Sequence, residues 1–155
     1  MDYPMKYQSV FRPGLFAGQI IIVTGGGSGL GRCTAHELAS LGATVALVGR
    51  KIEKLNAVQQ EIMTAGGKAS VHVCDIRDEA LVRSMVSTVL AQHGAIHHLV
   101  NNAGGQFPAL ARNLTLNGWE AVIKNNLTGG FLVSRECYTQ WMEAHGGAIV
   151  NIIAD

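Results

Sequence analysis

The sequence predicts an α/β protein with a doubly wound parallel sheet, and three observations support this prediction. Short apolar runs alternate along the chain with segments that favour helices. Hydrophobic residues make up 48% of the 155 residues and charged residues only 15%, and nineteen glycines are present, many of them between segments. Near-continuous apolar runs are typical of parallel strands covered on both faces, and alternating strands and helices form right-handed βαβ units. The length fits a single domain.

Strands are expected where β-branched and aliphatic residues cluster between turns. The first nineteen residues contain Pro4, Pro13, Gly14 and Gly18 and are expected to form an irregular arm, so the domain covers residues 20–155. In chain order, strands are predicted over 20–24 (IIIVT), 44–48 (TVALV), 70–74 (SVHVC), 97–101 (HHLVN) and 148–153 (AIVNII).

Helices are expected in the intervals between these strands, because each interval ends in a glycine that stops a helix. Asp78 is predicted to cap the third helix at its N-terminus, and Gly94 to follow its last residue. The helices are predicted over 29–41, 51–65, 78–93 and 117–145.

Composition excludes several classes of function. A formal net charge of +1 gives no electrostatic basis for binding nucleic acid or an anionic membrane, and no apolar run is long enough to span a bilayer. Cys33, Cys74 and Cys137 lie far apart without a CxxC spacing, so we expect neither disulfides nor a metal site. The six histidines show no ligand spacing and are expected at the surface or as caps. The N-terminus lacks the apolar core of a secretory signal, and we expect a cytoplasmic protein.

The turn after the first strand, TGGGSGLG over residues 24–31, predicts a phosphate-binding site. A strand, a glycine-rich turn and a helix in that order place unpaired N–H groups and the positive end of the helix dipole together. The turn leads into Leu30-Gly31-Arg32, so it lacks the lysine and hydroxyl of a P-loop. Gly25 permits the sharp turn, Gly29 admits a pyrophosphate, and Gly31 allows the helix to pack on the sheet. A glycine-rich turn without a ligand is the alternative.

Four motifs resemble those of the short-chain dehydrogenase/reductase family, from about Gly18 to Asp155. They are Thr24-Gly25-x-x-x-Gly29-x-Gly31, Cys74-Asp75-Ile76, Asn101-Asn102-Ala103-Gly104 and Asn125-Asn126-Leu127-Thr128-Gly129. The resemblance implies a Rossmann fold with strand order 3-2-1-4-5 and a nicotinamide cofactor. It implies Asn126 as a catalytic residue that anchors a water relay. It also implies cofactor-binding roles for Thr24, Gly25, Ser28, Gly29, Leu30, Gly31, Asp75, Ile76, Asn102, Ala103 and Gly104.

The end of the second strand predicts which cofactor is used. NAD-binding Rossmann proteins usually carry an acid there for the ribose 2′-OH, whereas this chain reads Val48-Gly49-Arg50-Lys51. A guanidinium pairs with a 2′-phosphate in a bidentate manner, so Arg50 favours NADP(H). The alternative for Arg50 is a solvated cation at the start of a helix, and Lys51 is as readily solvated as bound.

The catalytic residues that the resemblance implies are mostly missing. The family uses a Tyr as proton donor, a Lys four residues later, and a Ser that polarises the substrate; such tuning of a Tyr pKa by a cation is physically sound. Here the Ser position corresponds to Ala154, and no Tyr-x-x-x-Lys occurs. We expect a fragment truncated after the fifth strand and inactive alone. Asp155 is a candidate substitute for the Ser, and a solvated acid at the end of the sequence is the alternative for it. A naturally short, noncatalytic NADP-binding protein is the alternative.

The substrate class stays open between two readings. Ala154, together with Gly104-Gly105-Gln106-Phe107, resembles the branch with the enoyl-CoA and 2,4-dienoyl-CoA reductases, and bacterial relatives near it are citronellol-type alcohol or aldehyde dehydrogenases. Gln106 and Phe107 are candidates for an acyl pocket, although Phe107 as ordinary packing is the alternative. The resemblance also implies a homo-oligomer, with aromatic side chains of the 117–145 helix at the interface or in the core, and a peroxisomal location for a eukaryotic source.

Overall fold

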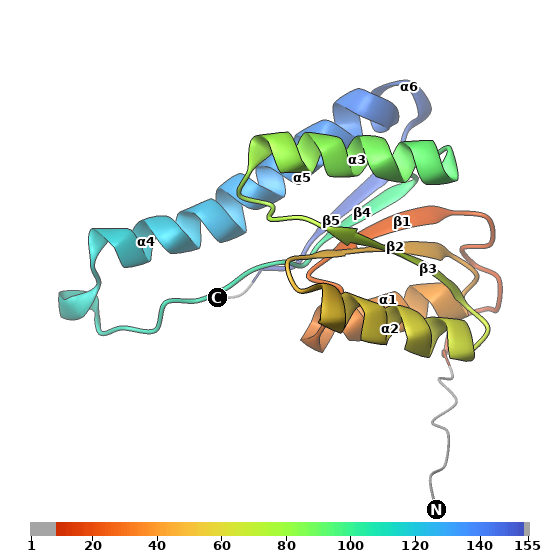
Figure 1. Cartoon of the computed structure of the whole chain (residues 1–155), viewed down its shortest axis with the longest axis horizontal. Coiled ribbons are helices and arrows are strands. Elements are labelled where there is room, and N and C mark those ends of the chain that lie inside the picture. The colour runs from red at the N-terminus through yellow and green to blue at the C-terminus, as the bar shows by residue number, and fades with distance from the viewer. Residues whose placement is uncertain (1–8, 154–155) are drawn as a thin grey trace, which may run out of the picture.

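The computed structural model describes residues 9–153, so Ala154 and Asp155 lie outside the described residues, as does the beginning of the predicted arm. Five parallel strands form one sheet in the order β3-β2-β1-β4-β5, as the resemblance implies (Figure 1). The strands are β1 (Ile20–Thr24), β2 (Thr44–Gly49), β3 (Lys68–Val73), β4 (His98–Asn101) and β5 (Ala148–Asn151). The doubly wound fold is therefore confirmed.

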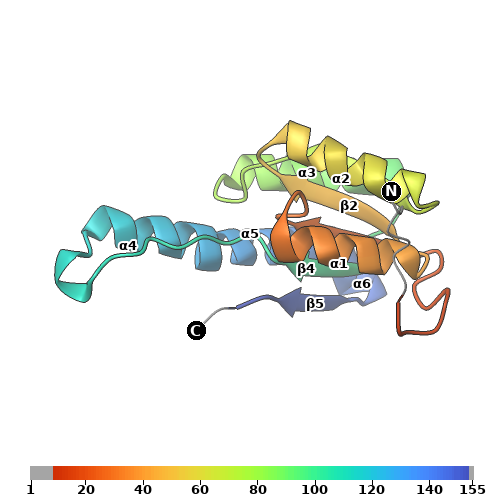
Figure 2. The same cartoon turned by 90° about the horizontal axis from the view of Figure 1, so that it is seen from below.

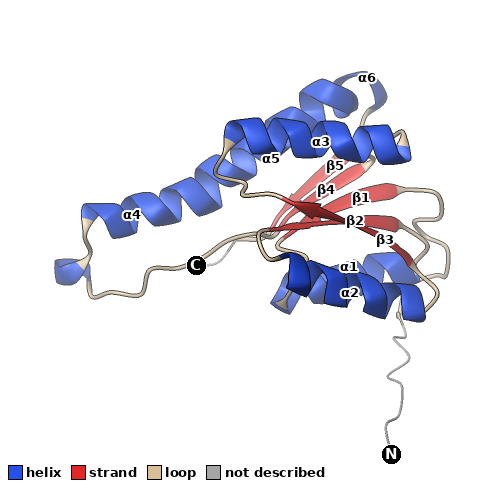
Figure 3. Cartoon of the chain, in the orientation of Figure 1, coloured by secondary structure: helices blue, strands red, loops and turns tan. Residues whose placement is uncertain are grey.

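Helices cover both faces of the sheet (Figure 3). One face carries α1 and α2, and the other carries α3, α5 and α6. The bounds are α1 (Gly29–Ser40), α2 (Ile52–Thr64), α3 (Glu79–His93), α4 (Leu116–Val122), α5 (Gly129–Cys137) and α6 (Glu143–His145). Asp78 caps α3 through a 3.0 Å hydrogen bond from the Leu81 amide, and Gly94 follows with a positive φ of 77°, both as predicted.

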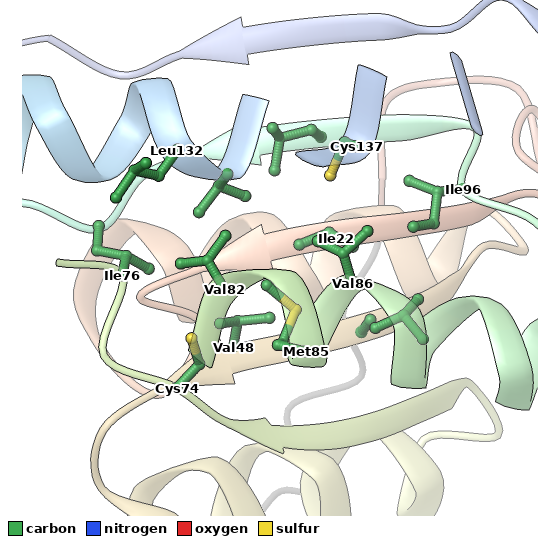
Figure 4. Packing of buried hydrophobic residues seen from close by; sticks show 14 of the residues in the cluster. Ile22, Val48, Cys74, Ile76, Val82, Met85, Val86, Ile96, Leu132 and Cys137 are labelled. Carbon is green, nitrogen blue, oxygen red and sulfur yellow. The ribbon is translucent and has the colours of Figure 1, made fainter. Parts of the chain in front are cut away.

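Two apolar clusters fill the spaces above and below the sheet. Because successive side chains of a strand point to opposite faces, Ile22 of β1 joins the cluster under α3 and α5, while Ile21 joins the cluster under α1 and α2. In the first cluster, Val86 of α3 and Cys137 of α5 meet Ile22 (Figure 4). Phe16 packs against the second cluster, and its amide donates to the Leu41 carbonyl at 3.0 Å, so this part of the arm lies on its own domain.

Strand boundaries differ from the prediction by one or two residues. β3 begins at Lys68 rather than Ser70, because Lys68 and Ala69 pair in register with Thr44 and Val45, although neither lysine nor alanine favours a strand. β5 ends at Asn151, although the Ile152 amide still donates to the Asn101 carbonyl at 2.9 Å. β5 forms one edge of the described sheet and all its residues are exposed (Figure 2).

The predicted 117–145 helix is a continuous rod with two changes of hydrogen bonding. Two π-helical segments, Ile123–Thr128 and Tyr138–Met142, separate α4, α5 and α6. The α4 end of the rod projects beyond the sheet (Figures 1 and 2). Trp141 packs against the core, whereas Trp119, Phe131 and Tyr138 are exposed. No helix among residues 9–153 has both the length and the apolar character needed to cross a membrane.

Candidate functional site

A cavity of about 300 Å³ opens at the carboxyl ends of the central strands. It lies where the strand order reverses beside β1, which is the usual ligand position in an open α/β sheet. Eight predicted site residues line it: Gly25, Ser28, Arg50, Asp75, Ile76, Asn102, Ala103 and Gly104. Further lining residues are Gly27, Val48, Gly49, Lys51, Lys54, Leu55, Cys74 and Asn125.

The glycines of the turn between β1 and α1 have separate steric reasons. Gly25 has a φ of 66°, and a Cβ there would stand 2.8 Å from Asn102 Nδ2. Gly29 has a φ of 52° and faces open space, with nothing within 4 Å of a Cβ. Gly31 is packed against the turn, since a Cβ would lie 2.4 Å from Asn102 Nδ2. The absence of a side chain at Gly31 thus lets α1 approach the turn and the residue after β4, and the space at Gly29 leaves room for a ligand.

The positive end of the α1 dipole is balanced by no capping side chain and no acidic residue of the first helical turn. Ser28 occupies the N-cap position, but its hydroxyl makes no capping hydrogen bond, and the first turn holds no acid. The first helical bond runs from Arg32 N to Ser28 O at 3.1 Å, so the amides of Gly29, Leu30 and Gly31 precede it. The Leu30 side chain is 69% exposed to solvent, so the part of Leu30 that can bind a ligand at the helix N-terminus is its backbone amide. This end of the helix suits a phosphate.

Thr24 and Asn102 lock the turn to the end of β4. The buried Thr24 Oγ accepts from the amides of Asn102 and Ala103, each at 3.0 Å, and Asn102 Nδ2 donates to Thr24 O at 2.9 Å. Asn102 thus ties the end of β4 to the end of β1, and it also lines the cavity. Thr24 does not line the cavity: it is buried, and its hydroxyl oxygen accepts the hydrogen bonds that hold the turn to β4.

Basic side chains gather where β2 meets α2. Arg50, Lys51 and Lys54 line one side of the cavity. Asp75 lines the same cavity, and hydrogen bonds from Arg77 are the main cause that lowers the pKa of its carboxyl group to about 2. Burial raises the pKa of the neighbouring Cys74 thiol to about 11, so that thiol is protonated. The cavity is therefore predominantly positive.

Asn126 lies in the π-helical segment between α4 and α5. Its Oδ1 accepts from the Gly105 amide at 2.8 Å, and its Nδ2 donates to the Gly105 carbonyl at 2.9 Å. Single-turn π segments are frequent at functional sites. Asn126 does not line the cavity, whereas its neighbour Asn125 does. The amide of Asn126 thus holds the loop that follows β4.

A second cavity of about 150 Å³ adjoins the first and shares Arg50 and Asn125 with it. Gln106 and Phe107 both line this second cavity, together with Arg77. The Phe107 ring also packs on Gly118, where a Cβ would stand 2.6 Å from the ring, as the packing alternative expects; its role in an acyl pocket stays a prediction.

Two features of the site escaped prediction. Lys54 lines the cavity from the first turn of α2, whereas Arg50 precedes the helix, and no spacing rule of the sequence brings the two together. Burial of His72 was not foreseen: its Nε2 lies 2.9 Å from Ser70 Oγ, and the expectation that all six histidines are surface or capping residues is wrong for it. Among residues 9–153, no group of three or more His, Cys, Asp or Glu side chains could hold a metal ion.

Comparison with known proteins identifies the family. A sequence model described as short chain dehydrogenase matches residues 19–155. The chain belongs to the short-chain dehydrogenase family. This family assignment fits the sheet order, the glycine turn and the Asn102 tie described above.

Individual members of the short-chain dehydrogenase family match most of this chain. It is 31% identical over 150 residues to a peroxisomal 2,4-dienoyl-CoA reductase of Danio rerio, covering 96% of this chain and 50% of the relative. A citronellol catabolism dehydrogenase of Pseudomonas aeruginosa PAO1 superposes with a TM-score of 0.93 at 58% identity, covering 96% of this chain and 61% of the other. A metagenomic short-chain oxidoreductase in complex with NADP gives 0.84 at 39% identity, covering 90% and 64%. The chain spans about half the length of the curated relatives it matches.

Proposed function

We propose that the chain is the NADP(H)-binding part of a short-chain oxidoreductase that transfers a hydride between a nicotinamide and a lipid-type substrate. The observation that carries the proposal is the pairing of an uncompensated helix N-terminus at Ser28 with Arg50 across one cavity. These two positive regions suit a ligand with two separate phosphate groups. The NADP complex of a 39% identical relative supports the same cofactor.

Each part of the cavity has a role in holding the cofactor. The Ser28 hydroxyl lines the cavity and, with the amides of Gly29, Leu30 and Gly31 that follow it at the start of α1, would hold the pyrophosphate. Arg50, with Lys54 in the same lining, would hold the 2′-phosphate. Asp75 and Ile76 would receive the adenine, and Asn102, Ala103 and Gly104 would line the ribose. Thr24 supports these contacts by fixing the turn to β4.

The bound nicotinamide would supply or accept the hydride. Asn126 orders the loop around Gly105 through its two hydrogen bonds, so its contribution is to position this wall of the site and the water relay beside it. The positive charge of the cavity favours contacts to phosphates.

Two substrate classes are candidates, and one comparison favours the second. The dienoyl-CoA reductases among the relatives support an enoyl-CoA thioester. The 58% identity with a citronellol catabolism dehydrogenase supports a branched terpenoid alcohol or aldehyde more strongly. In both cases the substrate carries a long apolar chain, for which Gln106 and Phe107 at the second cavity are candidate contacts.

A homo-oligomer is also part of the proposal. Trp119, Phe131 and Tyr138 expose apolar surface along the projecting helix, which suits contact with a second copy. The location, cytoplasmic or peroxisomal as in the zebrafish relative, stays a prediction.

Calorimetric titration with NADPH and NADH tests the cofactor. We expect NADPH to bind at least about tenfold more tightly, since a bidentate Arg–phosphate contact is a strong, charge-assisted one. Arg50→Asp should abolish or reverse this preference. Arg112→Asp makes the same charge change at an exposed position outside both cavities and should leave it intact. Equal affinities for the two cofactors in the unmodified protein would refute the assignment.

A further inference from the structure

Asp75 is the one acidic residue among those lining the larger cavity, which Arg50, Lys51 and Lys54 also line. An unpaired carboxylate in that place would repel a ligand phosphate. It would also attract the nearest guanidinium and compete with the ligand for it. How this single negative charge is handled therefore affects every anion that enters the cavity.

Arg77 donates three hydrogen bonds to the Asp75 carboxylate. Its Nε donates to Oδ1 at 2.8 Å, its Nη2 donates to Oδ2 at 2.5 Å, and its backbone amide donates to Oδ1 at 3.1 Å. This is a bidentate guanidinium–carboxylate pair, which fixes the plane of the carboxylate as well as its charge. The Arg77 side chain itself lies in the wall of the second cavity, beside the first.

Arg50 is in a different state from Arg77. Within residues 9–153 its guanidinium takes part in no ion pair, and it lines both cavities. Arg50 and Asp75 interact electrostatically, because the positive charge of Arg50 contributes to the low pKa of Asp75. Without Arg77, the unpaired Asp75 carboxylate would attract the Arg50 guanidinium electrostatically.

We propose that Arg77 is a positioning residue that sets cofactor selectivity: by binding Asp75, it cancels the negative charge of the cavity and leaves Arg50 available for a phosphate monoester on the ligand ribose. This inference rests on the proposed function, because it concerns the same nucleotide site. It assigns to a side chain two residues beyond Asp75 a role in discriminating a 2′-phosphorylated nucleotide from one with a free 2′-hydroxyl.

The test is a double-mutant comparison with the full chain, titrated with NADPH and with NADH. In Arg77→Gln, NADPH affinity should fall roughly five- to tenfold, as expected for one uncancelled charge near a phosphate. NADH affinity should change by less than about twofold, because NADH lacks that phosphate. The Asp75→Asn/Arg77→Gln double variant should restore the NADPH-to-NADH ratio, because the carboxylate is gone. Arg112→Gln is the control for overall charge, and thermal unfolding checks that each variant folds.

The outcomes separate the two proposals. An unchanged ratio in Arg77→Gln, or a ratio that the double variant does not restore, overturns the role of Arg77 while a preference for NADPH in the unmodified chain upholds the proposed function. No preference in the unmodified chain overturns both. Equal weakening of both cofactors in Arg77→Gln marks a merely structural role and also overturns the inference. If Arg77→Gln does not fold, Arg77→Lys replaces it and should give an intermediate ratio, because one charge remains without the fork.

Discussion

Gly31 lies so close to Gly25 that a Cβ on Gly31 would stand 2.3 Å from the Gly25 carbonyl oxygen. The first turn of α1 therefore packs directly on the backbone of the preceding turn. This contact fixes the helix N-terminus relative to the strand end, and the phosphate site depends on that relation.

Gly31→Ala should destabilise the protein by about 2–4 kcal/mol, because the obstructing atoms include backbone that cannot move freely. Gly130→Ala is the matched control, since Gly130 is also helical and a Cβ there meets nothing nearer than 3.9 Å. The control should be neutral or stabilising by up to about 1 kcal/mol. Urea unfolding measures both, and a fully stable Gly31→Ala protein would contradict the packing argument.

Removing the Thr24 hydroxyl should lower the free energy of unfolding, although the valine that replaces threonine has nearly the same side-chain shape. In Thr24→Val the amides of Asn102 and Ala103 lose their buried acceptor, at about 2–4 kcal/mol. Thr24→Ser keeps the oxygen and should cost about 1 kcal/mol, chiefly from the lost methyl group. Denaturant midpoints for the pair give the comparison, and a Val variant as stable as the Ser variant would show that the tie contributes little.

Stability should fall as the pH is lowered through the histidine range. Ser70 Oγ lies 2.9 Å from Nε2 of both His72 and His93, and burial lowers the pKa of each imidazole below 6.5. The unfolded chain therefore binds more protons than the folded one, so stability present above pH 6.5 is lost as the pH falls toward the folded-state pKa values.

Urea unfolding between about pH 7 and about pH 5 measures this dependence. The His72→Gln variant should show a shallower decline than the unmodified protein. A decline of the same steepness in both would assign the effect to other groups.

Thiol reactivity should distinguish the three cysteines. Cys33 is exposed, whereas Cys74 and Cys137 are buried, and burial raises the pKa of Cys137 to about 12. A thiol reagent such as DTNB should modify one thiol of the native chain quickly and all three in denaturant. Fast modification of two or three thiols under native conditions would contradict the packing around α5.

The 155-residue chain should bind cofactor without turning over substrate, because it contains no Tyr-x-x-x-Lys. Spectrophotometric assays of NADPH oxidation with crotonyl-CoA, and of NADP⁺ reduction with citronellol, should give rates equal to a blank without protein. Measurable turnover would show that other residues of this chain supply the proton, and Asn126→Ala would then be the first variant to assay.

The main features of the fold were predictable because they are locally encoded. Apolar runs located all five strands, and Asp78 and Gly94 located the ends of α3 through capping rules. The start of β3 was missed because pairing with Thr44, not local propensity, places Lys68 in the strand.

The site was predictable where backbone requirements fix the residue type, and less so where side chains meet through space. The steric need for glycine at Gly25 and Gly31 follows from the turn itself. The hydrogen bonds from Arg77 to Asp75 depend on the path of the chain after β3. The π-helical segment around Asn126 depends on packing along the helix that runs from α4 to α6. Neither has a clear signature in sequence spacing.

The position of β1 in the middle of the sheet has a consequence for how the chain folds. β1 pairs on one side with β2, which follows it closely, and on the other with β4, which lies far along the chain. The Ile20 amide, for example, donates to Nδ1 of His97, the residue before β4, 77 positions away. The β1–β2–β3 half closes short loops, whereas the β4–β5 half must close long ones at greater entropic cost. During synthesis, we therefore expect the side of the larger cavity that contains Arg50 to form first. The side that contains Asn102 should pack onto it later.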